Sequence, residues 1–124
     1  MEKKVLIIED DPDIGDLLEL HLKDLELNLD RAEDGVIGLQ KAIENDYELV
    51  LLDLMLPKMN GMEVCRRVKK ELALDKVFIV LLTAKGQELD RQKGQEVGAD
   101  LYMTKPFDPE VILNKAREVL NLPA

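Results

Sequence analysis

Five side chains that can hold a metal ion or a phosphate group follow short apolar runs of this sequence: Glu9, Asp10, Asp53, Thr83 and Lys105. Carboxylates that crowd together repel one another, and a hard divalent cation relieves the repulsion. Oxygen ligands with little nitrogen or sulfur favour Mg²⁺, Mn²⁺ or Ca²⁺ over Zn²⁺, and Mg²⁺ suits a site with only two or three carboxylates. A carboxylate beside such an ion, with a lysine and a threonine within reach, is equipped for phosphoryl transfer in which the carboxylate is the nucleophile.

The elements that must bring these residues together are predicted from alternating apolar and helical segments. Strands are predicted at Val5–Ile8, Leu27–Ala32, Leu49–Leu52, Val77–Leu82 and Ala99–Thr104. A helix follows each strand, and this (βα)₅ order predicts a single-domain, doubly wound α/β protein with a five-stranded parallel sheet covered by helices on both faces. Ligands of an open parallel sheet bind at the carboxyl ends of its strands, so one edge should collect all five side chains.

Four of the five predicted helices have apolar residues at helical spacing. Asp11 and Asp108 are predicted to cap the first and the last helix, because each precedes a proline. Gly38 should weaken the second helix by about 0.5–1 kcal/mol. The helix predicted over Gln87–Val97 has few apolar residues to anchor it. The residues expected to face inward include Leu17, Val36, Ile43, Leu72 and Val111.

Composition and charge argue against several classes of protein. The chain has 124 residues, which suits one domain with a core of its own. A net charge of -9 and an aromatic content of 3% argue against direct binding of nucleic acid. The sequence has no apolar run long enough to span a membrane, and its start does not have the pattern of a signal peptide. Cys65, the single cysteine, and His21, the single histidine, both lie on apolar stripes, where packing roles are expected.

Four separated motifs occur in the order LIIEDD, LLDLMLPKMNG, LLTA and TKPF. With them the chain resembles the receiver domain of bacterial two-component response regulators, the CheY-like family, from Val5 to about Leu120. The resemblance implies a flavodoxin-like fold with strand order 2-1-3-4-5 and one receiver domain over residues 1–124. It also implies a cytoplasmic signalling switch rather than an enzyme, one that catalyses only its own phosphorylation and dephosphorylation.

The resemblance further implies a role for each residue of the pocket. Asp53 matches the phosphorylated aspartate, Asp10 the carboxylate that binds Mg²⁺ directly, and Glu9 its neighbour that acts through water. The backbone carbonyl of Met55 matches the third protein ligand of the metal, for which Mn²⁺ is an alternative. Lys105 matches the lysine that should pair with Asp53 at rest and with the phosphoryl group afterwards.

Two other residues match the part of the family that carries the signal away from the pocket. Thr83 matches the switch hydroxyl that meets the phosphoryl group, and Tyr102 matches the aromatic that changes rotamer on activation. Pro106 follows a peptide bond that is typically cis in the family. The implied partner is a sensor histidine kinase or a histidine phosphotransfer protein, with no nucleic acid or membrane. The helix over 87–97, the fifth strand and the last helix form the expected output face, which would also serve a phosphorylated homodimer.

Two other functions stay open at the level of sequence. A Mg²⁺-dependent phosphatase of the haloacid-dehalogenase type also uses an aspartyl nucleophile, but such enzymes usually carry D-x-D near the first strand, whereas here D-L-M begins at Asp53 after the third. A binding module with a vestigial pocket is the other alternative, and the complete set of Asp53, Thr83 and Lys105 speaks against it. Turnover of a generic phosphate ester would favour the phosphatase, and failure to label with a small phosphodonor and Mg²⁺ would favour the vestigial module.

Overall fold

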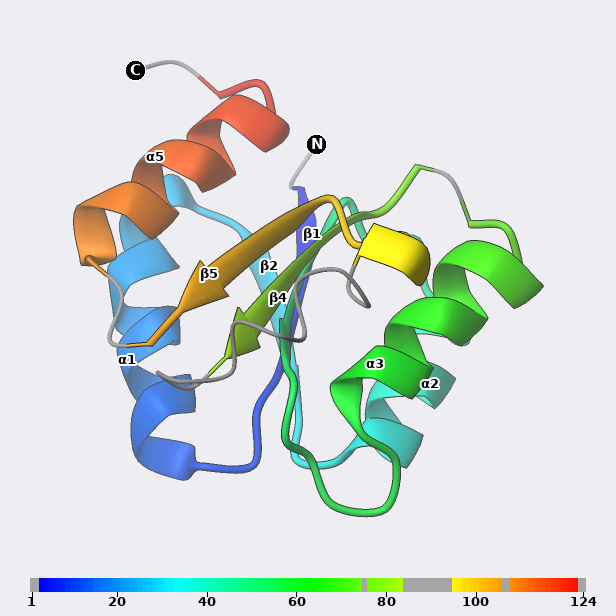
Figure 1. The fold of residues 1–124 in the computed structure, drawn as a ribbon. Coiled ribbons are helices and arrows are strands. Elements are labelled where there is room, and N and C mark those ends of the chain that lie inside the picture. The colour runs from blue at the N-terminus through cyan, green and yellow to red at the C-terminus, as the bar shows by residue number, and fades with distance from the viewer. Residues whose placement is uncertain (1–2, 75, 84–94, 106–107, 123–124) are drawn as a thin grey trace.

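A five-stranded parallel sheet forms the centre of the computed structural model, which describes residues 3–74, 76–83, 95–105 and 108–122. The strands are β1 (Lys4–Ile8), β2 (Asn28–Ala32), β3 (Leu49–Asp53), β4 (Phe78–Thr83) and β5 (Leu101–Thr104). Their spatial order is β2-β1-β3-β4-β5, and every neighbouring pair is parallel. The order and the pairing confirm the predicted flavodoxin-like fold, and the arrowheads of β4 and β5 point toward the same edge of the sheet in Figure 1.

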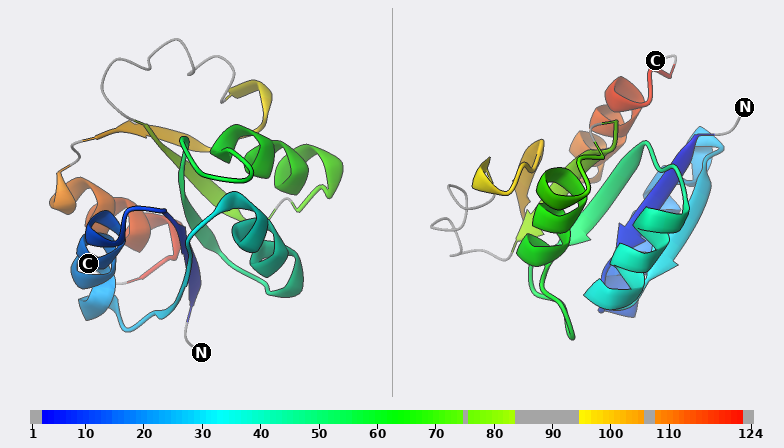
Figure 2. Two further views of the ribbon diagram at one scale, coloured as in Figure 1. Left: turned by 90° about the horizontal axis from the view of Figure 1, so that it is seen from below. Right: turned by 90° about the vertical axis from the view of Figure 1, so that its right-hand side faces the viewer.

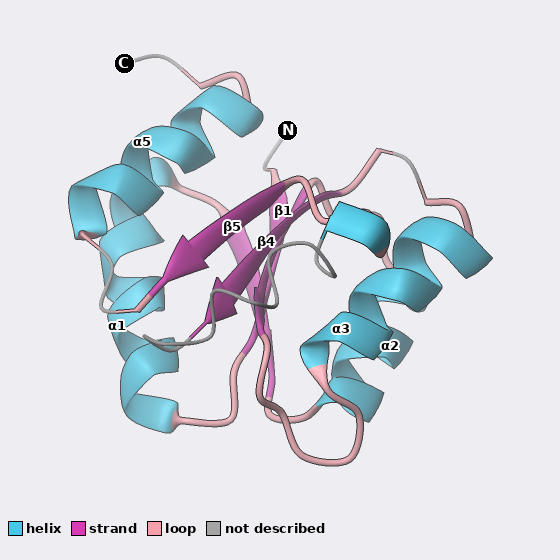
Figure 3. Cartoon of the chain, in the orientation of Figure 1, coloured by secondary structure: helices cyan, strands magenta, loops and turns pink. Residues whose placement is uncertain are grey.

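Helices cover both faces of this sheet (Figure 1, Figure 3). They are α1 (Pro12–Leu22), α2 (Gly35–Glu44), α3 (Gly61–Arg66) and α5 (Pro109–Val119). A 3₁₀ turn, Lys23–Leu25, follows α1, and one π-helical turn, Arg67–Glu71, follows α3. The two views of Figure 2 show α1 and α5 on one face of the sheet and α2 and α3 on the other. Of the helix predicted over Gln87–Val97, residues 87–94 lie outside the described part of the chain.

Side-chain caps determine where the helices begin. Asp11 and Asp108 each accept a hydrogen bond of 2.9 Å from the backbone N–H two residues further on, which confirms both predicted caps. Asp34 and Asn60 cap α2 and α3 through the N–H three residues further on. Each cap satisfies one of the N–H groups that a helix leaves unpaired at its start, and is worth about 1 kcal/mol. Within the described residues, no helix is both long and apolar enough to cross a membrane.

The core consists of two apolar layers, one on each face of the sheet. On β1, β3 and β5 the odd-numbered apolar residues pack toward α1 and α5. The even-numbered apolar residues of the same strands pack toward α2 and α3. Because helices cover the sheet from both sides, β3 is buried along its whole length.

Several residues that the sequence predicts to face inward are exposed instead. Helical spacing predicts an apolar stripe, but the packing against the sheet decides which side of the stripe is buried. Small residues bring α2 close to the sheet, so larger residues beside them turn outward. The buried residues of α2 are Gly35, Gly38, Leu39 and Ala42. The wrongly predicted residues, with their exposed fractions, are Leu17 (45%), Val36 (46%), Ile43 (54%), Leu72 (41%) and Val111 (49%).

Gly38 permits the close approach of α2 to β1. A Cβ at this position would lie 2.6 Å from Cδ1 of Ile8, which is fully buried. The loss of stability predicted from the sequence for Gly38 is a matter of helix propensity and concerns α2 by itself. The structure adds a packing requirement, because a side chain larger than hydrogen would push the helix away from the strand.

Candidate functional site

The alternation of side chains along the strands determines which of the predicted residues meet at the carboxyl edge of the sheet. Glu9, Asp53 and Lys105 continue the odd-numbered series of β1, β3 and β5, which faces α1 and α5. Their side chains therefore converge on one face. Thr83 and Tyr102 belong to the opposite series, which faces α2 and α3. The candidate site is thus built from two sets of residues that reach the edge from different faces.

Three carboxylates gather at this edge. Glu9, Asp10 and Asp53 each offer one oxygen, and these three oxygens all lie within 4.8 Å of one another. Glu9 and Asp53 are only 4% and 6% exposed, whereas Asp10 is exposed to solvent. Three hard oxygen donors at this spacing suit Mg²⁺ or Mn²⁺, which keep water as their remaining ligands on an exposed side.

The ammonium group of Lys105 contacts two of these carboxylates. Its Nζ donates to Oδ1 of Asp53 at 3.1 Å, which confirms the resting pair expected from the sequence. It also donates to Oε1 of Glu9 at 2.8 Å, a contact that the sequence motifs did not indicate. Glu9 and Lys105 are 96 positions apart along the chain, so no local pattern could have predicted this contact.

Burial and charge act on these groups in opposite directions. The pKa of Glu9 is raised to about 7, first because burial removes water from its carboxylate and also because Asp53 is close, while Lys105 opposes the rise. Burial disfavours the charged form of Lys105, but Glu9 and Asp53 together hold its pKa above the ordinary value. The pocket therefore keeps a positive charge beside Asp53.

Three other predicted site residues, Thr83, Met55 and Tyr102, belong to β4, to the loop after β3 and to β5. Thr83 ends β4 and is 1% exposed, and its carbonyl accepts a hydrogen bond of 2.6 Å from the Lys105 N–H. The side chain of Met55 is 63% exposed. Tyr102 is half-buried and packs against the apolar layer on the side of α2 and α3. Pro106, with its peptide bond, lies outside the described residues.

The cysteine and the histidine lie elsewhere in the fold. Cys65 is fully buried on α3, and its Sγ lies 3.6 Å from the carbonyl oxygen of Val97. Burial raises the pKa of the Cys65 thiol to about 12, and a thiol that stays protonated is not a nucleophile. His21 is half-buried near the end of α1, and its Nε2 is buried without a hydrogen-bond partner among the described residues. Both positions agree with the predicted packing roles.

The fold and the pocket define an open α/β protein with a carboxylate cluster and a lysine at the carboxyl edge of its sheet. The family model of the response regulator receiver domain matches residues 5–117. The chain therefore belongs to the response regulator receiver family, as its motifs indicated, and is a receiver domain of a two-component signalling system.

Relatives and solved structures agree with this assignment. The response regulator ArlR of Staphylococcus saprophyticus is 41% identical over 117 residues, which are 94% of this chain and 52% of the relative. The BeF3-activated DrrB receiver domain has a TM-score of 0.87 at 32% identity, over 98% of this chain and 99% of that one. A co-crystal of the Saccharomyces cerevisiae phosphotransfer protein Ypd1 with the receiver domain of Ssk1 matches with a TM-score of 0.85 at 25% identity, over 94% of this chain and 88% of that one. The chain spans about half the length of the curated relatives it matches.

Proposed function

We propose that Asp53 of this receiver domain accepts a phosphoryl group from a phosphohistidine on a sensor histidine kinase or a histidine phosphotransfer protein. The observation that carries the proposal is the Asp53 carboxylate, which ends a fully buried strand, is 6% exposed and lies 3.1 Å from the Lys105 ammonium. A charged side chain at the end of an apolar strand has no packing role that would explain it. The Ypd1–Ssk1 pair supports a phosphohistidine protein as the class of donor.

The transfer exchanges one bond of phosphorus for another. A carboxylate oxygen of Asp53 forms a bond to phosphorus, the phosphorus–nitrogen bond of the donor breaks, and the electron pair of that bond stays on the imidazole. Lys105 places its ammonium beside Oδ1 of Asp53, where the oxygens of the phosphoryl group arrive. The second contact of Lys105, with Glu9 at 2.8 Å, holds the ammonium in this place before the donor binds.

The residues of the acidic cluster fit a divalent cation. Asp10, Asp53 and the backbone carbonyl of Met55 would hold Mg²⁺, or Mn²⁺ in its place, with Glu9 acting through water. The bound ion supplies positive charge that offsets both the phosphoryl oxygens and the repulsion between the carboxylates. The three carboxylate oxygens within 4.8 Å of one another support this assignment.

Thr83 and Tyr102 carry the change away from Asp53 in this proposal. They lie on the same face of the sheet, and the strand of Thr83 is the neighbour of the strand that ends at Asp53. The hydroxyl of Thr83 donates to the new phosphoryl oxygens, and Tyr102 turns into the space that Thr83 leaves. The face that carries β5 and α5 then changes its contacts with a partner or with a second phosphorylated copy; residues 87–94, which the sequence assigns to the same output face, lie outside the described part of the chain. The domain modifies only itself in this cycle and so acts as a switch rather than as an enzyme.

Intact mass spectrometry after incubation with acetyl phosphate and Mg²⁺ tests the proposal. Wild-type protein should gain one phosphoryl group, and Asp53→Asn should gain none. Absence of labelling in the wild type would indicate a vestigial pocket, and steady release of phosphate from unrelated esters would indicate a phosphatase. Equal labelling of Asp53→Asn would assign the acceptor to another residue.

A further inference from the structure

The loop between β3 and α3, which carries Met55, is fixed at its two ends. At its start, the Leu54 N–H donates to the carbonyl of Leu82 on β4 at 2.9 Å. At its end, the Gly61 N–H donates back to the carbonyl of Leu54 at 2.8 Å. A Cβ on Gly61 would lie 2.2 Å from the carbonyl oxygen of Asp53, so this approach requires a glycine. These contacts fix the ends of the loop but not its middle.

The first turn of α2 holds the middle of the same loop. The Gly35 N–H donates to the carbonyl of Pro57 at 3.3 Å. A Cβ on Gly35 would lie 1.7 Å from the carbonyl oxygen of Met59. This oxygen belongs to the backbone and cannot swing aside as the end of a long side chain can. Glycine is therefore required at the point where the helix meets the loop.

Asp34 adds an ionic contact between the helix and the loop. Its Oδ1 accepts a hydrogen bond of 2.8 Å from the Ile37 N–H and so caps α2. Its Oδ2 lies 3.6 Å from Nζ of Lys58, a loop residue whose φ is 68°. Asp34 itself is only 5% exposed. The pKa of Asp34 lies below its ordinary value, first because the Ile37 N–H donates to the carboxylate and also because the Lys58 ammonium is near. One oxygen thus serves the helix and the other serves the loop.

We infer that Asp34, Gly35 and Lys58 are positioning residues for the backbone carbonyl of Met55, the third ligand of the proposed metal site. Met55 lies between a loop residue bonded to β4 and a loop residue bonded to α2, so its peptide group is held from both sides. Loss of the contact with α2 would leave the carbonyl with a wider range of orientations. Mutation of residues that contact and orient the ligands of a metal ion typically lowers the affinity for that ion by about 10- to 100-fold. The inference rests on the proposed function, because it concerns the same metal site.

Mg²⁺ affinity, measured by isothermal titration calorimetry, tests the inference together with the Mg²⁺-dependent NMR shifts of the loop amides. Gly35→Ala and Lys58→Met should each weaken Mg²⁺ binding by about 10-fold. Lys58→Arg keeps the positive charge and should bind Mg²⁺ as the wild type does. Gly38→Ala is the matched control, because it makes the same substitution in the same helix but faces Ile8 of β1 rather than the loop. It should lower the melting temperature without changing the Mg²⁺ affinity.

Asp10→Asn separates the failure of this inference from the failure of the proposed function. If the wild type binds Mg²⁺ and Asp10→Asn does not, wild-type affinity in folded Gly35→Ala and Lys58→Met would overturn the inference alone. If Asp10→Asn binds Mg²⁺ as the wild type does, the proposed metal site is wrong and the inference falls with it. Should Gly35→Ala not fold, Lys58→Met decides the question, because the Lys58 side chain is 68% exposed and its replacement leaves the core intact.

Discussion

Lys105 separates two carboxylates that would otherwise repel one another inside the pocket. Its Nζ lies 2.8 Å from Glu9 and 3.1 Å from Asp53, and both carboxylates are nearly buried. A buried charge that has lost its partner is costly, so the lysine stabilises the resting state of the site. A divalent cation bound by the same carboxylates would take over part of this role.

Removal of the ammonium should therefore make the fold depend on a divalent cation. Lys105→Met is expected to lower the free energy of unfolding by about 2 kcal/mol in the presence of a chelator, because Glu9 and Asp53 lose their counter-charge. Mg²⁺ should raise the melting temperature of this variant more than that of the wild type. Denaturation with and without Mg²⁺ measures both effects. The double variant Glu9→Gln, Lys105→Met is the control and should recover most of the loss. Equal stabilisation of wild type and Lys105→Met by Mg²⁺ would contradict this account.

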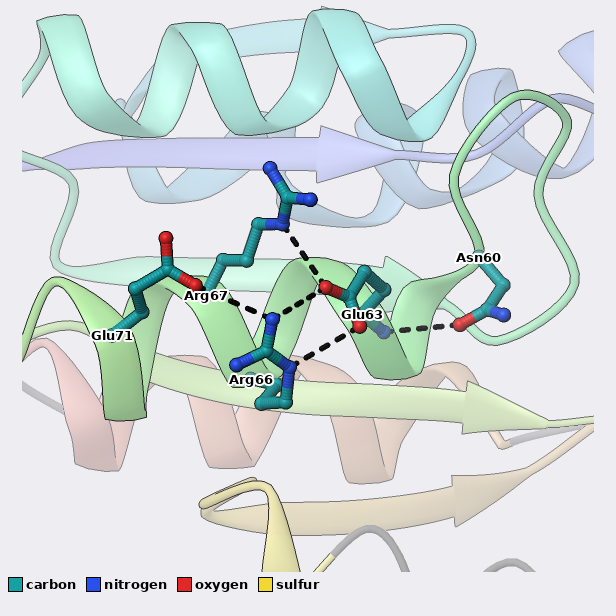
Figure 4. Close-up of polar contacts among 5 residues, drawn as sticks. All are labelled: Asn60, Glu63, Arg66, Arg67 and Glu71. Carbon is teal, nitrogen blue, oxygen red and sulfur yellow. Dashed lines mark hydrogen bonds and ion pairs between the residues drawn. The ribbon is translucent and has the colours of Figure 1, made fainter.

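At the scale of the element, the outer face of α3 carries a charge cluster that joins the helix to the π-helical turn (Figure 4). Oε1 of Glu63 accepts hydrogen bonds from Arg66 at 2.6 Å and from Arg67 at 3.0 Å. Arg66 also pairs with Glu71 at 3.3 Å, and Asn60 caps the helix through the Glu63 N–H. The pKa of Glu63 is lowered to about 2, first by the hydrogen bond from Arg66 and then by the one from Arg67.

This cluster predicts part of the acid sensitivity of the domain. The pKa of Glu63 rises from about 2 in the folded chain to its ordinary 4.5 on unfolding, so its stabilisation is complete above pH 4.5 and is lost as the pH falls through about 2. Glu63→Gln should therefore lose less stability than the wild type between these two pH values, as followed by thermal denaturation. Glu71→Gln is the matched control, because it leaves both arginine contacts of Glu63 in place and should keep the acid sensitivity that Glu63 contributes. The same slope in Glu63→Gln as in the wild type would show that the cluster contributes nothing.

Gly38 illustrates how packing between elements overrides helix propensity. Alanine would strengthen an isolated helix by about 1 kcal/mol, but here its Cβ would meet side-chain atoms of Ile8 at 2.6, 2.9 and 3.0 Å. Gly38→Ala is therefore expected to lower the free energy of unfolding by about 1 kcal/mol, as measured by urea denaturation. Ile8→Val removes the nearest atom, so the double variant should lose less stability than the two single variants together. Strictly additive losses would contradict the close contact.

The sequence predicted the elements better than it predicted their contacts. Strand ends were predictable because short apolar runs stop at charged residues, as at Asp53, and helix starts because Asp11 stands before a proline. The contact between Glu9 and Lys105 was not predictable, since it joins the two ends of the chain across the sheet. The outward position of Ile43 depends on how closely α2 approaches β1. Helical periodicity in the sequence carries no information about that distance.

At the scale of the whole molecule, a conformational change that carries a signal requires some segments to stay in place while others move. The segment 97–100, which leads into β5, is fastened to α3 and to the π-helical turn. Oδ2 of Asp100 lies 2.8 Å from Nζ of Lys69. The carbonyl of Val97 lies 3.6 Å from Sγ of the buried Cys65. The segment 97–100 is therefore the expected fixed end of any movement that begins at the end of β4.

A phosphoryl group on Asp53, as proposed, should accordingly change the segment from Thr83 up to the fixed end at Val97, and Tyr102 on the neighbouring strand, but not the segment 97–100. Beryllofluoride with Mg²⁺, a phosphoryl mimic present in the DrrB relative, should alter amide hydrogen exchange over 83–96 and at Tyr102, which shares a face with Thr83. Asp100 and α1 should keep their protection, because Asp100 is held by Lys69 and α1 packs on the other face. Thr83→Ala lacks the hydroxyl and should lose the response at Tyr102 while still binding beryllofluoride. A wild-type response confined to the pocket, or one that spreads through Asp100 into α3, would show that the signal takes another path.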